Sequence, residues 1–291
     1  MWAALTDPAA LDYWWGPAGF VTRTIRHEAV VGGSWEYTMD HPEQGFYPNH
    51  NHNRYLAVEP GVRLVYESLE DGVVLFEVEL ALQATAGGTD LTLRATFPTV
   101  EARDAAVTEV DAEEGGRQTL ARLGRLLGEP RDPTLNLTIA ADGDRNVVVT
   151  RHFNASAQRV WDAFVSPELV RQWLGTPEWP MTVCEIDLKV GGHFRYVWSN
   201  DRGGMGMTGT YVALAPPLRI DHTELFDEDW TDGDATVTTH FVEFGGGTTM
   251  VMEILYTSAA VRDAVLASPM RQGMNLNFNN LEQFFNTESS R

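Results

Sequence analysis

The feature that most constrains the fold of this chain is a repeat that spans most of its length. Residues of the first half recur in the second half at a nearly constant spacing, which is 159 residues near both ends of the repeat and 156 residues near its middle. Matched pairs include Trp2 and Trp161, Pro8 and Pro167, Trp14 and Trp173, Gly32 and Gly191, Gly33 and Gly192, Tyr37 and Tyr196, and Tyr55 and Tyr211. Chance does not keep one register over about 120 residues, so the chain contains two copies of one domain. Each copy is much longer than a solenoid repeat and is expected to bury its own core.

The composition is that of a globular protein with an acidic surface. Of the 291 residues, 43% are hydrophobic and 21% are charged, and no apolar run reaches the roughly 18 residues that a membrane span needs. The net charge of −20 is spread over both halves, which disfavours nucleic acid and anionic membrane surfaces as partners. The single cysteine, Cys184, excludes an internal disulfide and a cysteine-based zinc site. The first residues lack the features of a signal peptide, so we expect a cytoplasmic protein without membrane insertion.

The boundary between the copies is marked by residues that interrupt regular structure. Pro130, Pro133 and Gly143 stand among charged residues, a composition typical of an exposed connection. Within it, residues 134–139 alternate apolar and polar side chains, which indicates a short strand. We expect a first domain at residues 1–130, a linker at 131–145 and a second domain at 146–291, with the two domains packed as a pseudo-dimer.

The second copy contains the complete order of elements. Residues 146–153 predict a strand, and residues 157–165 predict a helix. Ser166 and Pro167 fit the cap and the first turn of another short helix. Six further strands are expected at residues 181–187, 193–198, 207–214, 218–226, 235–244 and 248–256. A final long helix is indicated by the apolar stripe of Met270, Met274, Phe278, Leu281 and Phe285.

This order of elements defines an α+β domain. The long helix has to cover the concave face of the curved antiparallel sheet, because nothing else in the copy can bury that face. We therefore expect two helix-grip domains, each a curved antiparallel sheet wrapped around a long C-terminal helix. The order resembles that of the START-like (SRPBCC) superfamily.

Short motifs in both copies carry a closer resemblance. In the first copy they are Thr6-Asp7-Pro8, Trp14-Trp15-Gly16-Pro17, Gly32-Gly33-Ser34-Trp35 and Tyr47-Pro48-Asn49-His50. In the second copy they are Phe153-Asn154-Ala155, Val160-Trp161, Ser166-Pro167, Trp173-Leu174-Gly175 and Gly191-Gly192. Both copies resemble the homologue domain of the activator of heat-shock protein 90 ATPase, related to polyketide cyclase and CalC-like proteins. The resemblance implies a cavity between sheet and helix, in a superfamily that hosts lipid carriers, resistance proteins, cyclases and co-chaperone modules.

The first copy departs from this pattern at its start. Met1 aligns with Val160, so the first strand and half of the first helix have no counterpart. One hypothesis is that residues 135–139 fold back onto the vacant edge of the first sheet. The alternative is that the true start lies upstream, in which case residues 134–139 serve as a linker or extend the second sheet.

Strand alternation in the second copy indicates a ligand cavity. One face of the strand at residues 193–198 carries only aromatic side chains. Seven of the eight methionines beyond Met1 lie in this copy, and methionine suits a pocket for bulky apolar ligands. The alternative is a packed core in which methionine fills gaps. We predict that the second copy, rather than the first, binds the ligand, through Phe194, Tyr196, Trp198, Met207, Met250, Met252, Met274 and Phe278.

Residue types that can bind metals are present in the sequence, but their spacing matches no diagnostic metal-binding motif. His50 and His52, with His41 across a hairpin, would suit zinc or nickel, but no acidic or cysteine ligand follows at a suitable spacing. Residues 227–234 contain five carboxylates and fail the calcium-loop pattern, which indicates a solvated loop. We therefore expect no metal site and no cofactor.

No catalytic motif is present in the sequence. Asp221 and His222 are adjacent on one strand and so point to opposite faces, which excludes a dyad. Cys184 is expected to be a buried, inert thiol. Further acid–base candidates, equally expected as polar residues on the outer face of a sheet, are Asp187, His193, Arg195 and Tyr196. We therefore name no catalytic residue.

Three functions remain as hypotheses. The first is binding or sequestration of a hydrophobic small molecule without catalysis, mainly by the second domain, and we favour it. The second is a cyclase- or hydrolase-type enzyme that uses the same cavity. The third is a chaperone-linked interaction module, which is weakened because both copies resemble one domain and leave no room for the activator's separate N-terminal domain.

Overall fold

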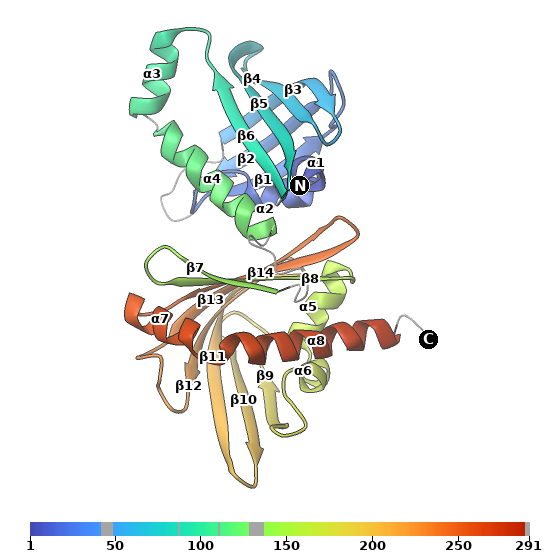
Figure 1. Cartoon of the computed structure of the whole chain (residues 1–291), viewed down its shortest axis with the longest axis vertical. Coiled ribbons are helices and arrows are strands. Elements are labelled where there is room, and N and C mark those ends of the chain that lie inside the picture. The colour runs from blue at the N-terminus through green and yellow to red at the C-terminus, as the bar shows by residue number, and fades with distance from the viewer. Residues whose placement is uncertain (42–48, 87, 110, 128–136, 289–291) are drawn as a thin grey trace. The chain divides into compact units, whose positions relative to one another are not determined.

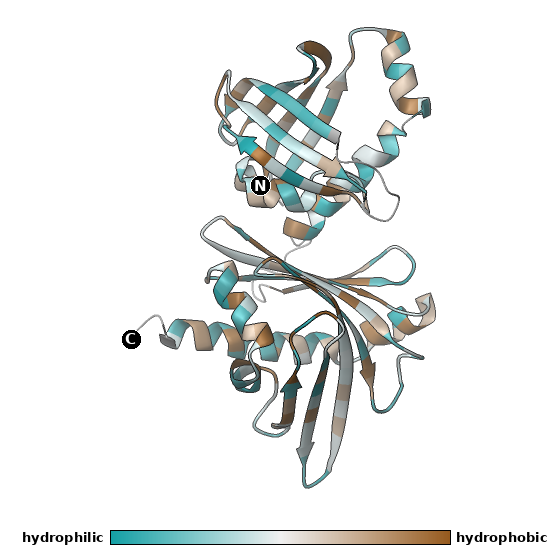
Figure 2. Cartoon of the chain, turned by 180° about the vertical axis from the view of Figure 1, so that it is seen from behind, coloured by the Kyte–Doolittle hydropathy of each residue, from teal (hydrophilic) through white to brown (hydrophobic). Residues whose placement is uncertain are grey.

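The computed structural model describes residues 1–41, 49–86, 88–109, 111–127 and 137–288 (Figure 1). It divides into two compact units, Met1–Leu127 and Gly128–Arg291. Each unit has its own antiparallel sheet and its own helices, so the expected tandem α+β organisation is confirmed. Over the described residues, no helix is long and apolar enough to cross a membrane, and hydrophilic and hydrophobic residues are interspersed along the helices and strands (Figure 2).

The first unit is built on a six-stranded sheet whose strands follow chain order. Its strands are β1 (Val21–His27), β2 (Ser34–Asp40), β3 (Asn49–Glu59), β4 (Arg63–Glu70), β5 (Val73–Thr85) and β6 (Gly88–Thr96). Its helices are α1 (Trp2–Thr6), α2 (Pro8–Trp14), α3 (Val100–Glu109) and α4 (Ala112–Leu127).

The second unit is built on an eight-stranded antiparallel sheet in the order β7-β8-β14-β13-β12-β11-β10-β9. Its strands are β7 (Leu137–Asp142), β8 (Asn146–Phe153), β9 (Met181–Ile186), β10 (His193–Asn200), β11 (Gly203–Ala215), β12 (Arg219–Phe226), β13 (Ala235–Phe244) and β14 (Gly247–Leu255). Its helices are α5 (Ala157–Val165), α6 (Pro167–Trp173), α7 (Ala259–Ala267) and α8 (Met270–Glu288). All six strands predicted between the short helices and the long helix are present.

The short helices begin where the sequence predicts caps. The side chains of Asp7 and Ser166 each accept a hydrogen bond from a backbone N–H of the following helix, which satisfies a donor that has no partner within the helix. The repeat-matched Trp14 and Trp173 then anchor these helices, because each indole Nε1 donates to a main-chain carbonyl of the preceding helix, at 2.7 Å and 2.8 Å. The two copies therefore fold locally in the same way.

A repeated glycine pair shapes one turn in each unit. Gly32 and Gly191 have φ of +80° and +79°, a region that favours glycine. A Cβ on Gly33 or Gly192 would lie 2.3 Å or 2.0 Å from a main-chain oxygen, so no larger residue fits. Next to this turn, the strands on either side of it therefore pair in the same register in both units.

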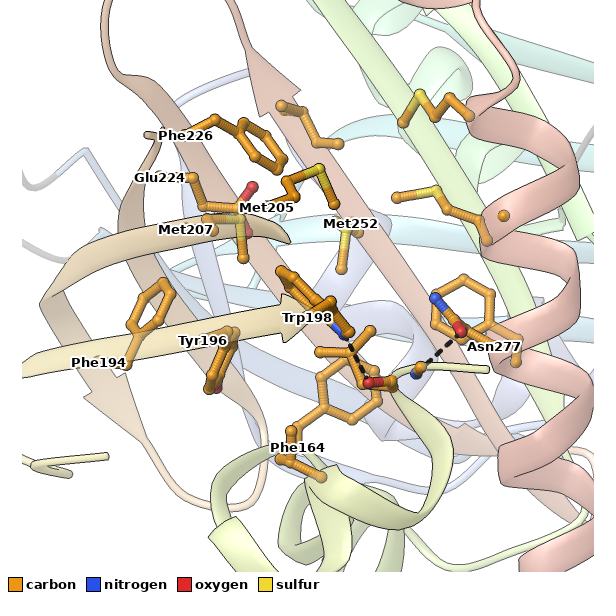
Figure 3. Close-up of a pocket in the computed structure, with 18 of the residues that line it drawn as sticks. Phe164, Phe194, Tyr196, Trp198, Met205, Met207, Glu224, Phe226, Met252 and Asn277 are labelled. Atoms are coloured by element: carbon orange, nitrogen blue, oxygen red, sulfur yellow. Dashed lines mark hydrogen bonds between the residues drawn. The ribbon is translucent and has the colours of Figure 1, made fainter. Parts of the chain in front are cut away.

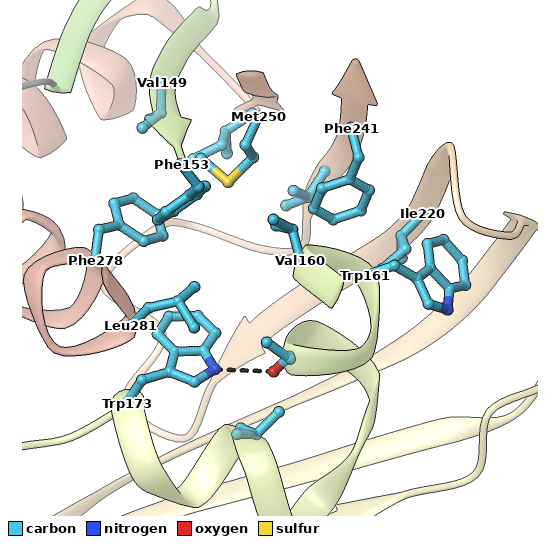
Figure 4. Close-up of a cluster of buried hydrophobic side chains, with 14 of the residues drawn as sticks. Val149, Phe153, Val160, Trp161, Trp173, Ile220, Phe241, Met250, Phe278 and Leu281 are labelled. Atoms are coloured by element: carbon cyan, nitrogen blue, oxygen red, sulfur yellow. Dashed lines mark hydrogen bonds between the residues drawn. The ribbon is translucent and has the colours of Figure 1, made fainter. Parts of the chain in front are cut away.

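Helix α8 covers the concave face of the second sheet, as predicted (Figures 1 and 4). Phe278, Leu281 and Phe285 are at most 3% exposed. The ring of Phe153 on β8 meets those of Phe278 and Phe285 edge-on, with centroids 5.9 Å apart in both pairs. Full burial of such a side chain contributes roughly 1.5–3 kcal/mol, so this stripe holds the helix on the sheet.

Strand β7 corrects the expected linker and one of the two hypotheses for residues 134–139. It pairs antiparallel with β8 of the second sheet, and Leu137 and Ile139 are buried in the second core. The hypothesis that this segment fills the edge of the first sheet is therefore wrong for residues 137–139, and the alternative, extension of the second sheet, holds for them. Residues 135 and 136 lie outside the described residues. The alternating apolar side chains match the inner face of the second sheet, which selects that register.

Each unit also has a short helix that the sequence analysis did not predict. Helices α3 and α7 precede the long helices α4 and α8. Val265 is the only buried residue of α7, and α3 has none. A helix that buries so little leaves almost no apolar periodicity in the sequence.

Candidate functional site: an apolar cavity in the second unit

A cavity of about 670 Å³ lies in the second unit, between the inner face of the sheet and helix α8 (Figure 3). Strands β10 to β14 form one wall, and α6, α8 and the loops around them form the other. The volume falls in the range of roughly 300–1,000 Å³ that small-molecule sites occupy. Aromatic side chains, methionines and aliphatic side chains provide most of its lining.

Strand β10 contributes the aromatic wall that alternation predicts. The rings of Phe194 and Tyr196 are 4.9 Å apart between centroids, and those of Tyr196 and Trp198 are 6.1 Å apart. The indole Nε1 of Trp198 donates a hydrogen bond to the carbonyl of Leu174 at 2.9 Å (Figure 3). This bond holds the ring against the cavity.

Seven of the eight predicted site residues line this cavity: Phe194, Tyr196, Trp198, Met207, Met252, Met274 and Phe278. The eighth, Met250, does not. It alternates onto the same face of β14 as Met252 but is fully buried in the closed core (Figure 4). Alternation identifies the face of a strand, and it does not reveal how far along that face a cavity extends. The role of all eight residues in ligand binding stays a prediction.

Methionines concentrate around the cavity. Met205 and Met207 on β11 lie opposite Trp198 and Tyr196 in the strand register. The methionines that line the cavity are Met205, Met207, Met252, Met270 and Met274. Because these side chains are unbranched and flexible, the walls can adapt to ligands of different shape.

Three large apolar side chains of the lining are also exposed to solvent. Trp179, Met205 and Trp230 are 37%, 48% and 48% exposed. Together they form an apolar rim, which marks the side from which a ligand can enter. Trp230 belongs to the acidic loop at residues 227–234, whose five carboxylate residues are all exposed, as predicted.

The sequence analysis missed a polar pair inside the cavity. His222 and Glu224 both line it, and His222 Nε2 is 3.0 Å from Glu224 Oε1. Residues two apart on a strand share a face, so the spacing on β12 was a usable signal. A comparison of His222 with its neighbour Asp221 does not reveal the pair, because adjacent residues on a strand point to opposite faces. Asp221 pairs instead with Arg219, at 2.8 Å, so the absence of an Asp221–His222 dyad is confirmed.

Three tyrosines also contribute polar atoms to the cavity. Burial raises the pKa of Tyr196 and of Tyr256, and it raises the pKa of Tyr211 to about 12. The hydroxyls of Tyr196 and Tyr211 are hydrogen-bonded to each other. Cys184, opposite Tyr196 on β9, is buried as predicted, and burial raises the pKa of its thiol. These groups are therefore protonated at neutral pH.

The remaining acid–base candidates do not converge. Arg195 forms a bidentate ion pair with Asp227 on the outer face, with both N–O distances 2.6 Å. His193 hydrogen-bonds to Thr210 there at 2.9 Å, and Asp187 pairs with a lysine two residues away. Only Tyr196 of the four lines the cavity.

The histidines of the first unit are also apart from any acidic ligand set. His50 and His52 lie on β3, and His41 packs edge-on against Phe20 with centroids 5.1 Å apart. In the part of the chain that the structure describes, no group of three or more His, Cys, Asp or Glu side chains is placed to hold a metal.

In the first unit, aromatic rings occupy the positions that match the cavity wall. Trp35 and Tyr37 correspond to Phe194 and Tyr196 in the repeat, and their rings stack with centroids 4.3 Å apart. Trp15 packs edge-on against Trp35 at 5.4 Å and donates a hydrogen bond to the Tyr37 hydroxyl. These rings pack on one another, which favours a closed core over a ligand site in this unit.

Comparison with known proteins supports the tandem fold. The family model described as "Activator of Hsp90 ATPase homolog 1-like protein" matches residues 1–128 and 154–286. A solved structure of a protein from Rhodobacter sphaeroides is 34% identical, with a TM-score of 0.50, and the match covers 52% of this chain and 99% of that one. A protein from Mycobacterium smegmatis is 26% identical over 51% of this chain and 96% of that one, with a TM-score of 0.47. None of the curated proteins matches. The Rhodobacter sphaeroides match, over about half of this chain, agrees with two domains of one kind.

Proposed function

We propose that this chain, which belongs to the family of Activator of Hsp90 ATPase homolog 1-like proteins, binds and sequesters a hydrophobic small molecule in the cavity of its second unit. The observation that carries the proposal is the cavity itself, about 670 Å³ in volume and lined mostly by apolar side chains. Cores pack at the density of organic crystals and contain few voids larger than a water molecule. A void of this size next to an exposed apolar rim is therefore best explained as a ligand site.

The driving force for binding would be removal of apolar surface from water. Each Å² of apolar contact contributes about 25 cal/mol. The aromatic wall of β10 supplies rigid contact area, and the methionines of β11, β14 and α8 supply adaptable contact area. This combination suits a bulky ligand with an aromatic or polycyclic body.

The experiment is native mass spectrometry of the purified full chain, to look for a co-purified organic molecule, followed by titration with a solvatochromic apolar dye. Met252→Ala removes part of the cavity wall, and Met39→Ala is a matched methionine variant in the first unit. We expect the dye to bind saturably and Met252→Ala to weaken it, while Met39→Ala leaves it unchanged. Dye binding that neither variant alters, with no co-purified molecule, would contradict the proposal.

A second candidate is an enzyme that uses the same cavity, and the His222–Glu224 pair favours it. A histidine held by a carboxylate is a common general base. If the chain is an enzyme, its co-purified molecule should change mass on incubation with the wild type and stay intact with His222→Ala. An unchanged molecule in both samples would leave binding without catalysis.

A further inference from the structure

The charged group in the described lining of the cavity is negative. Among the described residues that line it, Glu224 is the only carboxylate, and no arginine or lysine is present. Any anionic group that entered would meet this carboxylate, and the one lining side chain that can carry a positive charge, His222, already contacts it. Charge complementarity therefore bears on which ligands the cavity accepts.

Glu224 is held in place and still has a free acceptor. His222 Nε2 contacts its Oε1 at 3.0 Å, and in the described chain no side chain or amide donates to Oε2. The Glu224 side chain is 23% exposed, although it lies on the inner face of β12 beside Phe226 (Figure 3). Solvent reaches Oε2, and a ligand amine would replace that water with a charge-assisted hydrogen bond.

Aromatic side chains surround this acceptor. The hydroxyl groups of Tyr196 and Tyr256 are buried, and the charge of Glu224 adds to the effect of burial in raising the pKa of both. Phe194 lies edge-on to the His222 ring with centroids 5.3 Å apart. The cavity wall is rich in aromatic rings, and the faces of such rings attract cations.

The residues at the entrance of the cavity also carry negative charge. Residues 227–234, which carry the rim residue Trp230, hold five carboxylates, and Asp227 pairs with Arg195. The whole chain carries a net charge of −20. Such a field raises the local concentration of cations and lowers that of anions at the entrance.

We propose that the cavity selects a ligand with an apolar, aromatic or polycyclic body and a protonated amine that donates to Glu224, and that it rejects carboxylated and phosphorylated amphiphiles. The inference rests on the proposed binding function and names the class of its ligand. The apolar body accounts for the walls, and the amine accounts for the one carboxylate of the described lining. Fatty acids and phospholipids are disfavoured, since the described lining holds no lysine or arginine to balance their charge.

The test is a fluorescence titration of the full chain with four probes that share one ring system: 1-methylpyrene, 1-pyrenemethanol, 1-pyrenemethylamine and 1-pyreneacetate. We expect the amine to bind at least about tenfold more tightly than the carboxylate, because a hydrogen bond between charged groups contributes about 1.5–3 kcal/mol. The alcohol should lie between them. Equal affinities, or tighter binding of the carboxylate, would overturn the inference while binding of methylpyrene leaves the proposed function standing.

Two variants assign the selectivity to one side chain. Glu224→Gln keeps an acceptor for His222 and removes the charge, and we expect it to weaken the amine by about tenfold while the alcohol changes less than about twofold. Glu185→Gln, an exposed position on β9, is the matched control and should change neither. Amine selectivity that survives in Glu224→Gln would overturn the assignment. Failure of all four probes to bind would overturn the proposed function, and the inference with it.

Discussion

His222 and Glu224 show how much one residue's environment matters in this chain. Both lie on β12, and an exposed pair of this kind would have little effect on stability or binding. Here they are among the few polar groups in a cavity of aromatic and methionine side chains. In the proposed binding function their contribution would be larger for that reason, since electrostatic interactions strengthen where water is excluded.

At the residue scale we expect Trp198→Ala to lower affinity for an apolar dye more than His52→Ala does. Trp198 contributes cavity wall, whereas His52 lies on β3 of the first unit. Loss of about 60 Å² of apolar contact weakens binding about tenfold. Fluorescence titration of both variants measures the difference. A larger loss for His52→Ala, restored by added zinc, would instead support a metal site.

A second residue-scale prediction concerns alkaline pH. Burial raises the pKa of Tyr37 and of Tyr211 to about 12, above the usual value near 10. The folded chain therefore holds these protons more tightly than the unfolded chain, so the stabilisation is complete below about pH 10 and is lost as pH rises towards 12. Urea unfolding across this range should show a falling free energy of unfolding.

The matched variant for this experiment is Tyr211→Phe. It removes one of the buried tyrosine hydroxyls whose pKa is raised, so its free energy of unfolding should fall less steeply between about pH 10 and 12. An identical slope for wild type and variant would show that Tyr211 does not contribute.

At the scale of elements, β7 shows how a segment between two domains becomes part of the sheet of one of them. Its inner residues Leu137 and Ile139 join the core of the second unit and lengthen the sheet by one strand beyond β8. An added edge strand covers backbone groups of β8 that would otherwise be unpaired.

We therefore expect Leu137→Ala to destabilise the second unit by about 2–5 kcal/mol, as deletion of buried leucine atoms does in other cores. Hydrogen exchange measured by mass spectrometry should increase in β8 and β14 and stay unchanged in β1 to β6. Val212→Ala, at a position 54% exposed on β11, is the control and should change stability by less than about 0.5 kcal/mol. Faster exchange in the first unit would show that β7 stabilises a different domain.

At the scale of the whole molecule, the two units use one fold in two ways. In the first, the rings of Trp15, Trp35 and Tyr37 pack together on the inner side of the sheet. In the second, Phe194 and Tyr196, which match Trp35 and Tyr37 in the repeat, line a cavity together with Trp198. The two copies therefore share an architecture, while the matched rings pack differently, stacked in the first unit and tilted in the second.

This asymmetry predicts the stoichiometry of binding. The full chain should bind one equivalent of a solvatochromic apolar dye, and Trp198→Ala should weaken that single site. Titration at a protein concentration well above the dissociation constant gives the number of sites directly. Two sites of equal affinity, or one site insensitive to Trp198→Ala, would contradict binding by the second unit alone.

Much of the architecture could be predicted from local pattern. The repeat established two domains of one fold, and the strands, the capped short helices and the apolar stripe of α8 followed from periods of two and 3.6 residues. Asp7 and Ser166 cap their helices as expected, because capping depends on residues only two or three positions apart. Helices α3 and α7 escaped prediction because they bury almost nothing.

The sequence by itself thus determined which face each side chain takes, and tertiary structure decided what lies on that face. Met250 and Met252 alternate onto one side of β14, yet only packing against neighbouring elements places the first in the closed core and the second at the cavity. In the same way, β7 belongs to the second unit because it pairs with β8 rather than with β6. His222 and Glu224 line a cavity because five strands come together there. The physical reason is that backbone geometry sets alternation between neighbours, whereas the size of a cavity depends on contacts between residues far apart in the chain.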